Sequence, residues 1–303
     1  MKETPSLKEE LEAYRRAGRI ASTVRKEVLK LVQPKKQIRE ICEETENMIR
    51  KMGGNPAFPT NVSIDYVAAH YTSPPNDETL IPNEGLVKVD LGASIDGYLS
   101  DTAVTIDVGG FETPMVAAAE GALRAAISIV KAGIDIKQVG KTISSTIVDA
   151  GFRPVSNLTG HSLARYELHS GISLPNVPTM LGHTMKEGEV FAIEPFVTKR
   201  DGRGYVKDTD DAFIFSCSES RAYANQSDDP GWKLLVELRK RFGRLPFALR
   251  WLDESPDAKQ FRKLVRSGSV ISYPVLVESG KRIVAQAEHT ILVKKYGCEV
   301  LTV

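Results

Sequence analysis

Two aspartates lie in a stretch of this sequence that otherwise has the pattern of a buried β-hairpin, and they restrict how the chain can fold. Asp90 occurs in LVKVDLG and Asp101 in LSDTAVTIDV, and Asp96-Gly97 between them is a favoured hairpin turn. Because the two aspartates are an odd number of positions apart across a tight turn, both side chains are expected on one face, directly opposed or diagonal. Carboxylates roughly 5–8 Å apart repel each other unless a proton or a cation intervenes. The pair predicts a cation site; the alternative is one exposed loop aspartate and one that caps a helix.

A histidine and two glutamates strengthen this prediction. His161 follows Gly160 in a loop that also holds His169, and Glu194 and Glu288 lie in the apolar segments VFAIE and VAQAEHTILV, where glutamate is disfavoured. A salt bridge explains one buried glutamate, but four buried carboxylates beside a histidine are hard to explain without cations. Their summed charge balances two divalent ions, and oxygen and nitrogen ligands without sulfur suit Mn, Fe, Co or Zn. The sequence therefore predicts a two-metal site of the kind that activates water for hydrolysis.

Composition excludes several other classes of protein. The chain has 303 residues, of which 42% are hydrophobic, enough for one large core, and its net charge of +1 gives no case for a nucleic-acid or membrane partner. Three cysteines without a CxxC spacing argue against a zinc ribbon or a disulfide scaffold and fit a reducing cytoplasm. The N-terminus has no apolar signal region, and the longest apolar stretch is broken by Glu120, Arg124 and Lys131. We expect a soluble cytoplasmic protein.

The hydrophobic pattern divides the chain into helical and strand segments. The expected helices are 7–33, 37–52, 113–131 and 136–150, and the expected strands are 62–67, the two arms of the hairpin, EVFAIEPFV, RIVAQAEHTILVKK and CEVLTV. Segment 217–267 has almost no strand signal and an excess of Lys and Arg, which indicates a helical insertion. This order of elements predicts an α+β fold, with an antiparallel sheet and helices packed on its outer face.

Together these motifs resemble those of a known family. The segments KVDLGASIDGYLSDTA, GHSLARYELHSG, FAIEPFVT and AEHTILV resemble the metal motifs of methionine aminopeptidases, and the resemblance covers nearly the whole chain. The segment AFPTNVSIDYVAAHYTSPPND is similar to the one that carries the family's substrate-side histidine, here His70. Segment 217–267 looks like the insertion of the type 2 branch in its short archaeal form. The resemblance implies a pita-bread fold with two pseudo-symmetric halves, and a single catalytic domain over 1–303.

The resemblance also implies a role for each site residue. Asp90, Asp101 and Glu288 would hold one metal ion, and Asp101, His161, Glu194 and Glu288 the other. Glu194 would transfer the proton, and His70 and His169 would contact the substrate and donate hydrogen bonds to its carbonyl. Phe58 and Leu168 are candidates for the pocket of the first side chain, with ordinary core packing as the alternative. His183 and His289 are expected to be structural.

The function implied by the resemblance is removal of the initiator methionine from nascent proteins with a small second residue. The expected cofactor is two divalent ions of Co, Mn, Fe(II) or Zn. Alternatives on the same fold are an Xaa-Pro aminopeptidase or dipeptidase, and a non-catalytic protein that binds RNA or other proteins. We expect a monomer without membrane or specific DNA partners. The basic insertion is either a solvated face or a surface for transient contact with ribosomal RNA.

Overall fold

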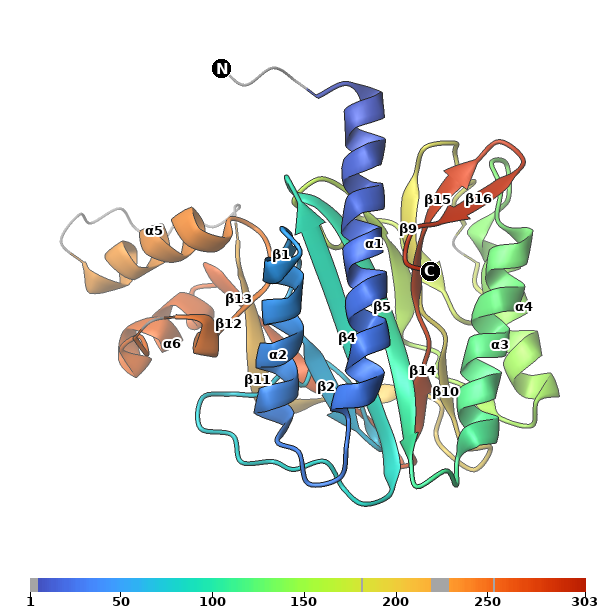
Figure 1. Ribbon diagram of the computed structural model, residues 1–303, viewed down its shortest axis with the longest axis horizontal. Coiled ribbons are helices and arrows are strands. Elements are labelled where there is room, and N and C mark those ends of the chain that lie inside the picture. Colours follow the sequence, from blue (N-terminus) through green and yellow to red (C-terminus); the bar gives the residue numbers. More distant parts are fainter. Residues whose placement is uncertain (1–4, 181, 219–228, 253) are drawn as a thin grey trace.

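Four long helices cover one face of the β-structure (Figure 1). The computed structural model describes residues 5–180, 182–218, 229–252 and 254–303. The helices are α1 Leu7–Leu31, α2 Ile38–Lys51, α3 Thr113–Ile129 and α4 Ile136–Asp149, so all four predicted helices are confirmed. A capping box between Ser6 and Glu9 explains where α1 begins. In the described ranges, no helix combines the length and apolar character that crossing a membrane requires.

The first half of the chain builds its strands around one hairpin. The strands are β1 Asn55–Pro56, β2 Asn61–Ile64, β3 Val67–Ala69, β4 Gly85–Ile95 and β5 Tyr98–Val108. The hairpin β4–β5 turns at Asp96 and Gly97, whose positive φ values of 51° and 87° are those of a type I′ turn. Residues 62–67 were expected to form one strand, but they belong to β2 and β3, because a turn at Asp65, with φ 49°, separates the two.

The second half repeats the plan of strands beneath a helix pair. Its strands are β6 Arg153–Pro154, β7 Thr159–Leu163, β8 Ser173–Pro175, β9 Val190–Ile193, β10 Phe196–Thr198, β14 Val284–Gln286, β15 His289–Lys294 and β16 Gly297–Val300. Val89 and Leu91 of β4 pack beneath α1 and α2, whereas Phe191 and Val293 pack beneath α3 and α4. Strand pairing is antiparallel throughout these strands, which confirms the predicted α+β class.

Both predicted long strands that carry a glutamate are interrupted at that glutamate. β9 ends before Glu194 and β10 begins after Pro195, while Glu288 lies between β14 and β15. The reason is a change of partner, since β9 pairs with β15 and β10 pairs with β14. The chain steps from one sheet to the next at these points, so the two glutamates lie at strand breaks and not inside strands as expected.

A further pair of strands flanks the predicted insertion. β11 Val206–Cys217 pairs with β13 Val270–Glu278, and between them come α5 Pro230–Phe242, β12 Phe247–Ala248, the short helix Leu249–Trp251 and α6 Ala258–Arg266. Neither β11 nor β13 was anticipated from the sequence. We propose that 217–267 is an insertion into a single domain, because the chain leaves and rejoins one sheet at its ends. Residues 219–228 and 253 of this segment lie outside the described residues.

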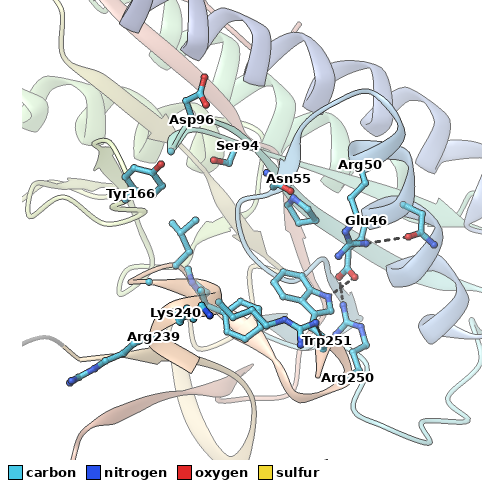
Figure 2. Close-up of a pocket in the computed structure, with 18 of the residues that line it drawn as sticks. Glu46, Arg50, Asn55, Ser94, Asp96, Tyr166, Arg239, Lys240, Arg250 and Trp251 are labelled. Carbon is cyan, nitrogen blue, oxygen red and sulfur yellow. Dashed lines mark hydrogen bonds and ion pairs between the residues drawn. The ribbon is translucent and has the colours of Figure 1, made fainter. Parts of the chain in front are cut away.

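A buried ion pair joins the inserted segment to the first half of the chain. Arg250 pairs with Glu46 of α2, and their side chains are 4% and 2% exposed. Trp251 Nε1 donates to the same carboxylate at 2.6 Å (Figure 2), and Arg250 Nη1 donates to Thr72 Oγ1 at 2.7 Å. These contacts hold the segment after α5 against α2.

Candidate metal centre and substrate pocket

The hairpin places its two aspartates on one face. Asp101 lies opposite Gly92 and Asp90 opposite Ala103, so the aspartates are diagonal neighbours and not directly opposed. The neighbours of Asp90, Val89 and Leu91, pack toward the helices. Side chains alternate along a strand, so Asp90 faces away from the helices. The predicted shared face is confirmed, and of the two arrangements left open the structure adopts the diagonal one.

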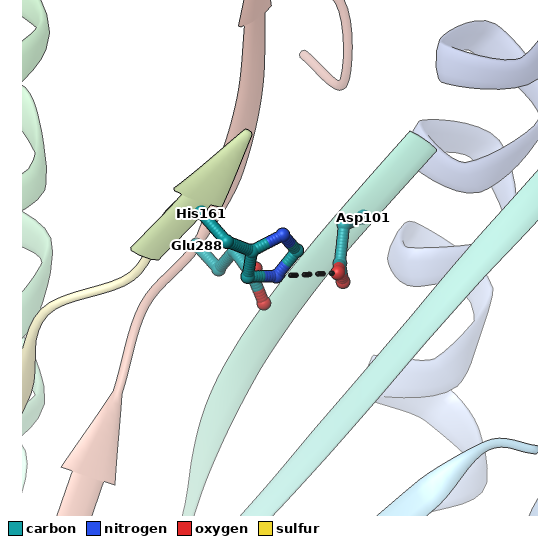
Figure 3. A group of neighbouring side chains, drawn as sticks. All are labelled: Asp101, His161 and Glu288. Atoms are coloured by element: carbon teal, nitrogen blue, oxygen red, sulfur yellow. Dashed lines mark ion pairs between the residues drawn. The ribbon is translucent and has the colours of Figure 1, made fainter. Parts of the chain in front are cut away.

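Strands from both halves bring the remaining predicted residues to this face. His161 Nε2 lies 3.5 Å from Asp101 Oδ2 (Figure 3) and 3.6 Å from Glu194 Oε1. One ligand atom each of Asp101, His161 and Glu288 lies within 4.8 Å of the other two, and all three residues are buried. Asp90 and Glu194 line the same cavity. The five residues predicted from separate motifs are thus gathered in one place.

The electrostatics of this cluster favour a proton or a cation beside the carboxyl groups. Burial, followed by the charges of neighbouring carboxylates, raises the pKa of Asp90, Glu194 and Glu288 well above the ordinary values, and burial raises the pKa of Asp101 to about 7. Oδ1 of Asp90 and Oδ1 of Asp101 are buried and have no hydrogen-bond partner. Buried oxygens of this kind are costly unless a donor or a cation satisfies them. The donor set therefore fits divalent metal ions.

The raised pKa of Asp101 gives a pH dependence that can be measured. An acid whose pKa is higher in the folded than in the unfolded state stabilises the fold below its unfolded pKa of about 3.8, and this contribution is lost as the pH rises through about 7. We expect the free energy of unfolding of the metal-free protein to fall between these two pH values. Urea unfolding in the presence of a chelator measures it. Equal stability at both ends of the range would contradict the expectation, and saturating Mn²⁺ should abolish the decline.

His70 and His169 lie beside the cluster. The His169 ring stands 4.2 Å from that of His161, centroid to centroid, and burial lowers the pKa of His169 to about 3. His70 has a strained backbone with φ 63°, and its Nδ1 lies 3.2 Å from the carbonyl oxygen of Pro274. A carbonyl only accepts, so Nδ1 carries the proton, and burial lowers the pKa of this ring and favours its neutral form. His70 Nε2 is then an acceptor, which differs from the donor role expected from the sequence.

The two other histidines lie away from this cavity. His183 Nε2 lies 3.0 Å from both carboxylate oxygens of Glu189. His289 Nδ1 lies 2.9 Å from Thr302 Oγ1 on the opposite face of the sheet from the side chain of Glu288. Both placements agree with the structural roles expected for them.

A cavity of about 310 Å³ adjoins the cluster. Phe58 and Leu168 line it, as the sequence suggested. Ile214 and Tyr273 line it as well, and these were missed because they come from β11 and β13. Gln286 was also missed. Its Nε2 donates to Glu288 Oε2 at 3.4 Å. The sequence could have indicated this contact, because residues two positions apart on a strand share a face and Gln286 comes two residues before Glu288. The lining of the cavity combines apolar side chains with a cluster of polar ones, as substrate pockets do.

Comparison with known proteins identifies the family. The model of metallopeptidase family M24 matches residues 12–216. The chain belongs to this family. A curated relative named methionine aminopeptidase, from Methanothermobacter thermautotrophicus, is 43% identical over 96% of this chain and 98% of its own length. Relatives with the same name from Thermococcus onnurineus and other archaea are 40–43% identical, which confirms the resemblance found in the sequence.

Solved structures share the fold of this chain. A thermophilic Arx1 aligns with a TM-score of 0.84 at 23% identity, covering 97% of this chain and 90% of that one. The methionine aminopeptidase of Thermotoga maritima aligns with a TM-score of 0.71 at 24% identity, covering 100% and 98%. At these identities the likeness concerns the fold, and it confirms the predicted pita-bread architecture.

Proposed function

We propose that this M24 protein removes the N-terminal methionine from newly made polypeptides and prefers a small second residue. The observation that carries the proposal is the gathering of four carboxylates, of which those of Asp101 and Glu288 are buried, and His161 in the lining of a cavity of about 310 Å³. Two histidines beside this cluster supply polar groups for a peptide bond, and an apolar wall supplies a place for the methionine side chain. The names of the archaeal relatives support the same activity.

We propose that the cluster holds two divalent ions. Asp90, Asp101 and Glu288 would bind one, and Asp101, His161, Glu194 and Glu288 the other, so that Asp101 and Glu288 bridge. The oxygen and nitrogen donors suit Co, Mn, Fe(II) or Zn. Bound ions of this kind lower the pKa of water and polarise a carbonyl group.

Side chains of the protein would transfer the proton, stabilise the carbonyl oxygen and bind the substrate. Glu194, with its side chain 13% exposed at the cavity, takes a proton from the attacking water and later gives one to the leaving amine. His169 donates a hydrogen bond to the carbonyl oxygen as negative charge develops on it. His70 Nε2 accepts a hydrogen bond from the N–H of the peptide bond that is cleaved. Phe58 and Leu168 contact the methionine side chain.

Peptide hydrolysis tests the function directly. We expect release of free methionine from Met-Ala-Ser in the presence of Mn²⁺ or Co²⁺, none after chelation, and much slower release from Met-Leu-Ser. Faster cleavage of a peptide with proline in second place would instead indicate an Xaa-Pro peptidase. No cleavage of any peptide by the metal-loaded protein would indicate a binding protein.

We also propose that the protein acts in the cytoplasm as a monomer, with segment 217–267 making transient contact with ribosomal RNA. The last turn of α5 carries Arg239, Lys240 and Arg241, and basic side chains attract phosphate backbones. The protein should pellet with ribosomes at low and moderate salt and dissociate at high salt. Protein that stays in the supernatant at moderate salt would contradict the contact.

A further inference from the structure

Hydrogen bonds on the helix side of the sheet hold the backbones of Asp101 and Glu288. Glu288 lies at the break between β14 and β15, where its carbonyl is outside the strand ladders. Thr102 Oγ1 donates to this carbonyl at 2.8 Å, and Arg25 Nη1 lies 3.4 Å from it. A buried carbonyl left without a donor is energetically costly. These two donors therefore set where the backbone of Glu288 lies.

A reciprocal contact holds the backbone of Asp101. Thr290 Oγ1 accepts from the N–H of Asp101 at 2.7 Å and donates to the carbonyl of Asp101 at 2.7 Å. Thr102 follows Asp101 and reaches Glu288, while Thr290 comes two residues after Glu288 and reaches Asp101. Both threonines are fully buried. The two segments that carry Asp101 and Glu288 are thus clamped to each other by two hydroxyl groups.

Arg25 connects this clamp to helix α1. Its Nη1 donates to Thr102 Oγ1 at 2.7 Å and lies 3.0 Å from His289 Nδ1. A guanidinium only donates, so Thr102 Oγ1 accepts from Arg25, and its own proton is directed to the carbonyl of Glu288. Arg25 and His289 also line a cavity of about 590 Å³ between α1 and α3.

We propose that Arg25 is a positioning residue for the metal centre, acting through Thr102 on the backbone of Glu288. The inference rests on the proposed function, because it concerns the same site. Residues behind the ligands of a metal typically change its affinity 10–100-fold when they are replaced. A positioning role and a purely electrostatic role of Arg25 predict opposite changes in metal affinity when Arg25 is replaced. A nearby cation repels metal ions, so loss of the Arg25 charge alone would tighten metal binding, whereas loss of positioning weakens it.

The test is the variant Arg25→Met, with Lys26→Met as its matched control. Lys26 is the exposed neighbour on α1, so the control removes the same charge without touching the clamp. Calorimetric titration with Mn²⁺ or Co²⁺ alone should show binding about 10-fold weaker or more for Arg25→Met and unchanged for Lys26→Met. The kcat for Met-Ala-Ser should fall while KM stays within about twofold, since the substrate pocket is untouched.

Thr102→Val removes the hydroxyl without changing charge, and it should weaken metal binding in the same direction. It keeps the proposal testable if Arg25→Met does not fold. The double variant Arg25→Met/Thr102→Val should bind metal no more weakly than the weaker-binding single variant, because both substitutions act on one carbonyl. Metal binding that is unchanged or tighter in Arg25→Met overturns the proposal. If the parent protein binds Mn²⁺ but releases no methionine, the proposed function fails while the metal titrations still decide the role of Arg25.

Discussion

Replacing Glu288 with glutamine is expected to lower kcat/KM for Met-Ala-Ser at least about 10³-fold. Glutamine keeps the size of the side chain but removes a charge that is proposed to bridge both ions. Metal ions contribute several kcal/mol of transition-state stabilisation, and about 4 kcal/mol corresponds to a factor of 10³. Continuous assay of methionine release, together with measured metal content, separates lost metal from lost chemistry.

A second glutamate-to-glutamine variant controls for the loss of one negative charge outside the metal centre. Glu299→Gln removes a glutamate from the same C-terminal segment, at a side chain that is 34% exposed and paired with Arg15. Its activity should stay within about twofold of the parent, since surface ion pairs contribute little. Glu288→Gln protein that keeps two equivalents of metal and parental activity would contradict the ligand assignment.

Replacing Glu46 with alanine is expected to lower the free energy of unfolding by about 3–5 kcal/mol. The change leaves the guanidinium of Arg250 buried without its carboxylate, and breaking a buried pair in this way is costly. It also removes the acceptor of Trp251 Nε1 and of the Thr60 N–H. Urea unfolding followed by far-UV circular dichroism measures the loss.

The matched control for Glu46 lies on the same helix. Glu43 pairs with Arg39 at 2.8 Å, but the two side chains are 45% and 44% exposed. Glu43→Ala should therefore cost less than about 1 kcal/mol. A similar small loss for Glu46→Ala would mean that the Arg250 pair does not stabilise the attachment of the inserted segment.

Local patterns account for the features that were predicted well. The helix ends of α1 to α4 were found to within two residues, because apolar spacing and stop signals act over a few neighbouring residues. The shared face of Asp90 and Asp101 followed from the parity of their spacing, which is the same for the directly opposed and the diagonal arrangement. Parity alone leaves those two arrangements open, and the register Gly92 to Asp101 decides between them.

The strand breaks at Glu194 and Glu288 illustrate what local patterns miss. Both segments are apolar and rich in β-branched residues, so each has the pattern of one continuous strand. The breaks arise because β9 and β10, and likewise β14 and β15, pair in different sheets. Sheet partners are far apart in the sequence, and the pattern within one segment carries no information about them.

By itself, the sequence determined which residues form the candidate centre, because buried carboxylates without a cation would be too costly to keep in apolar segments. Only the tertiary structure decided how they are held. The clamp of Thr102 and Thr290, the neutral His70 paired with Pro274, and the placement of Ile214 and Tyr273 in the pocket each join segments distant along the chain. Such contacts depend on how whole strands and helices pack, and no short stretch of sequence specifies that packing.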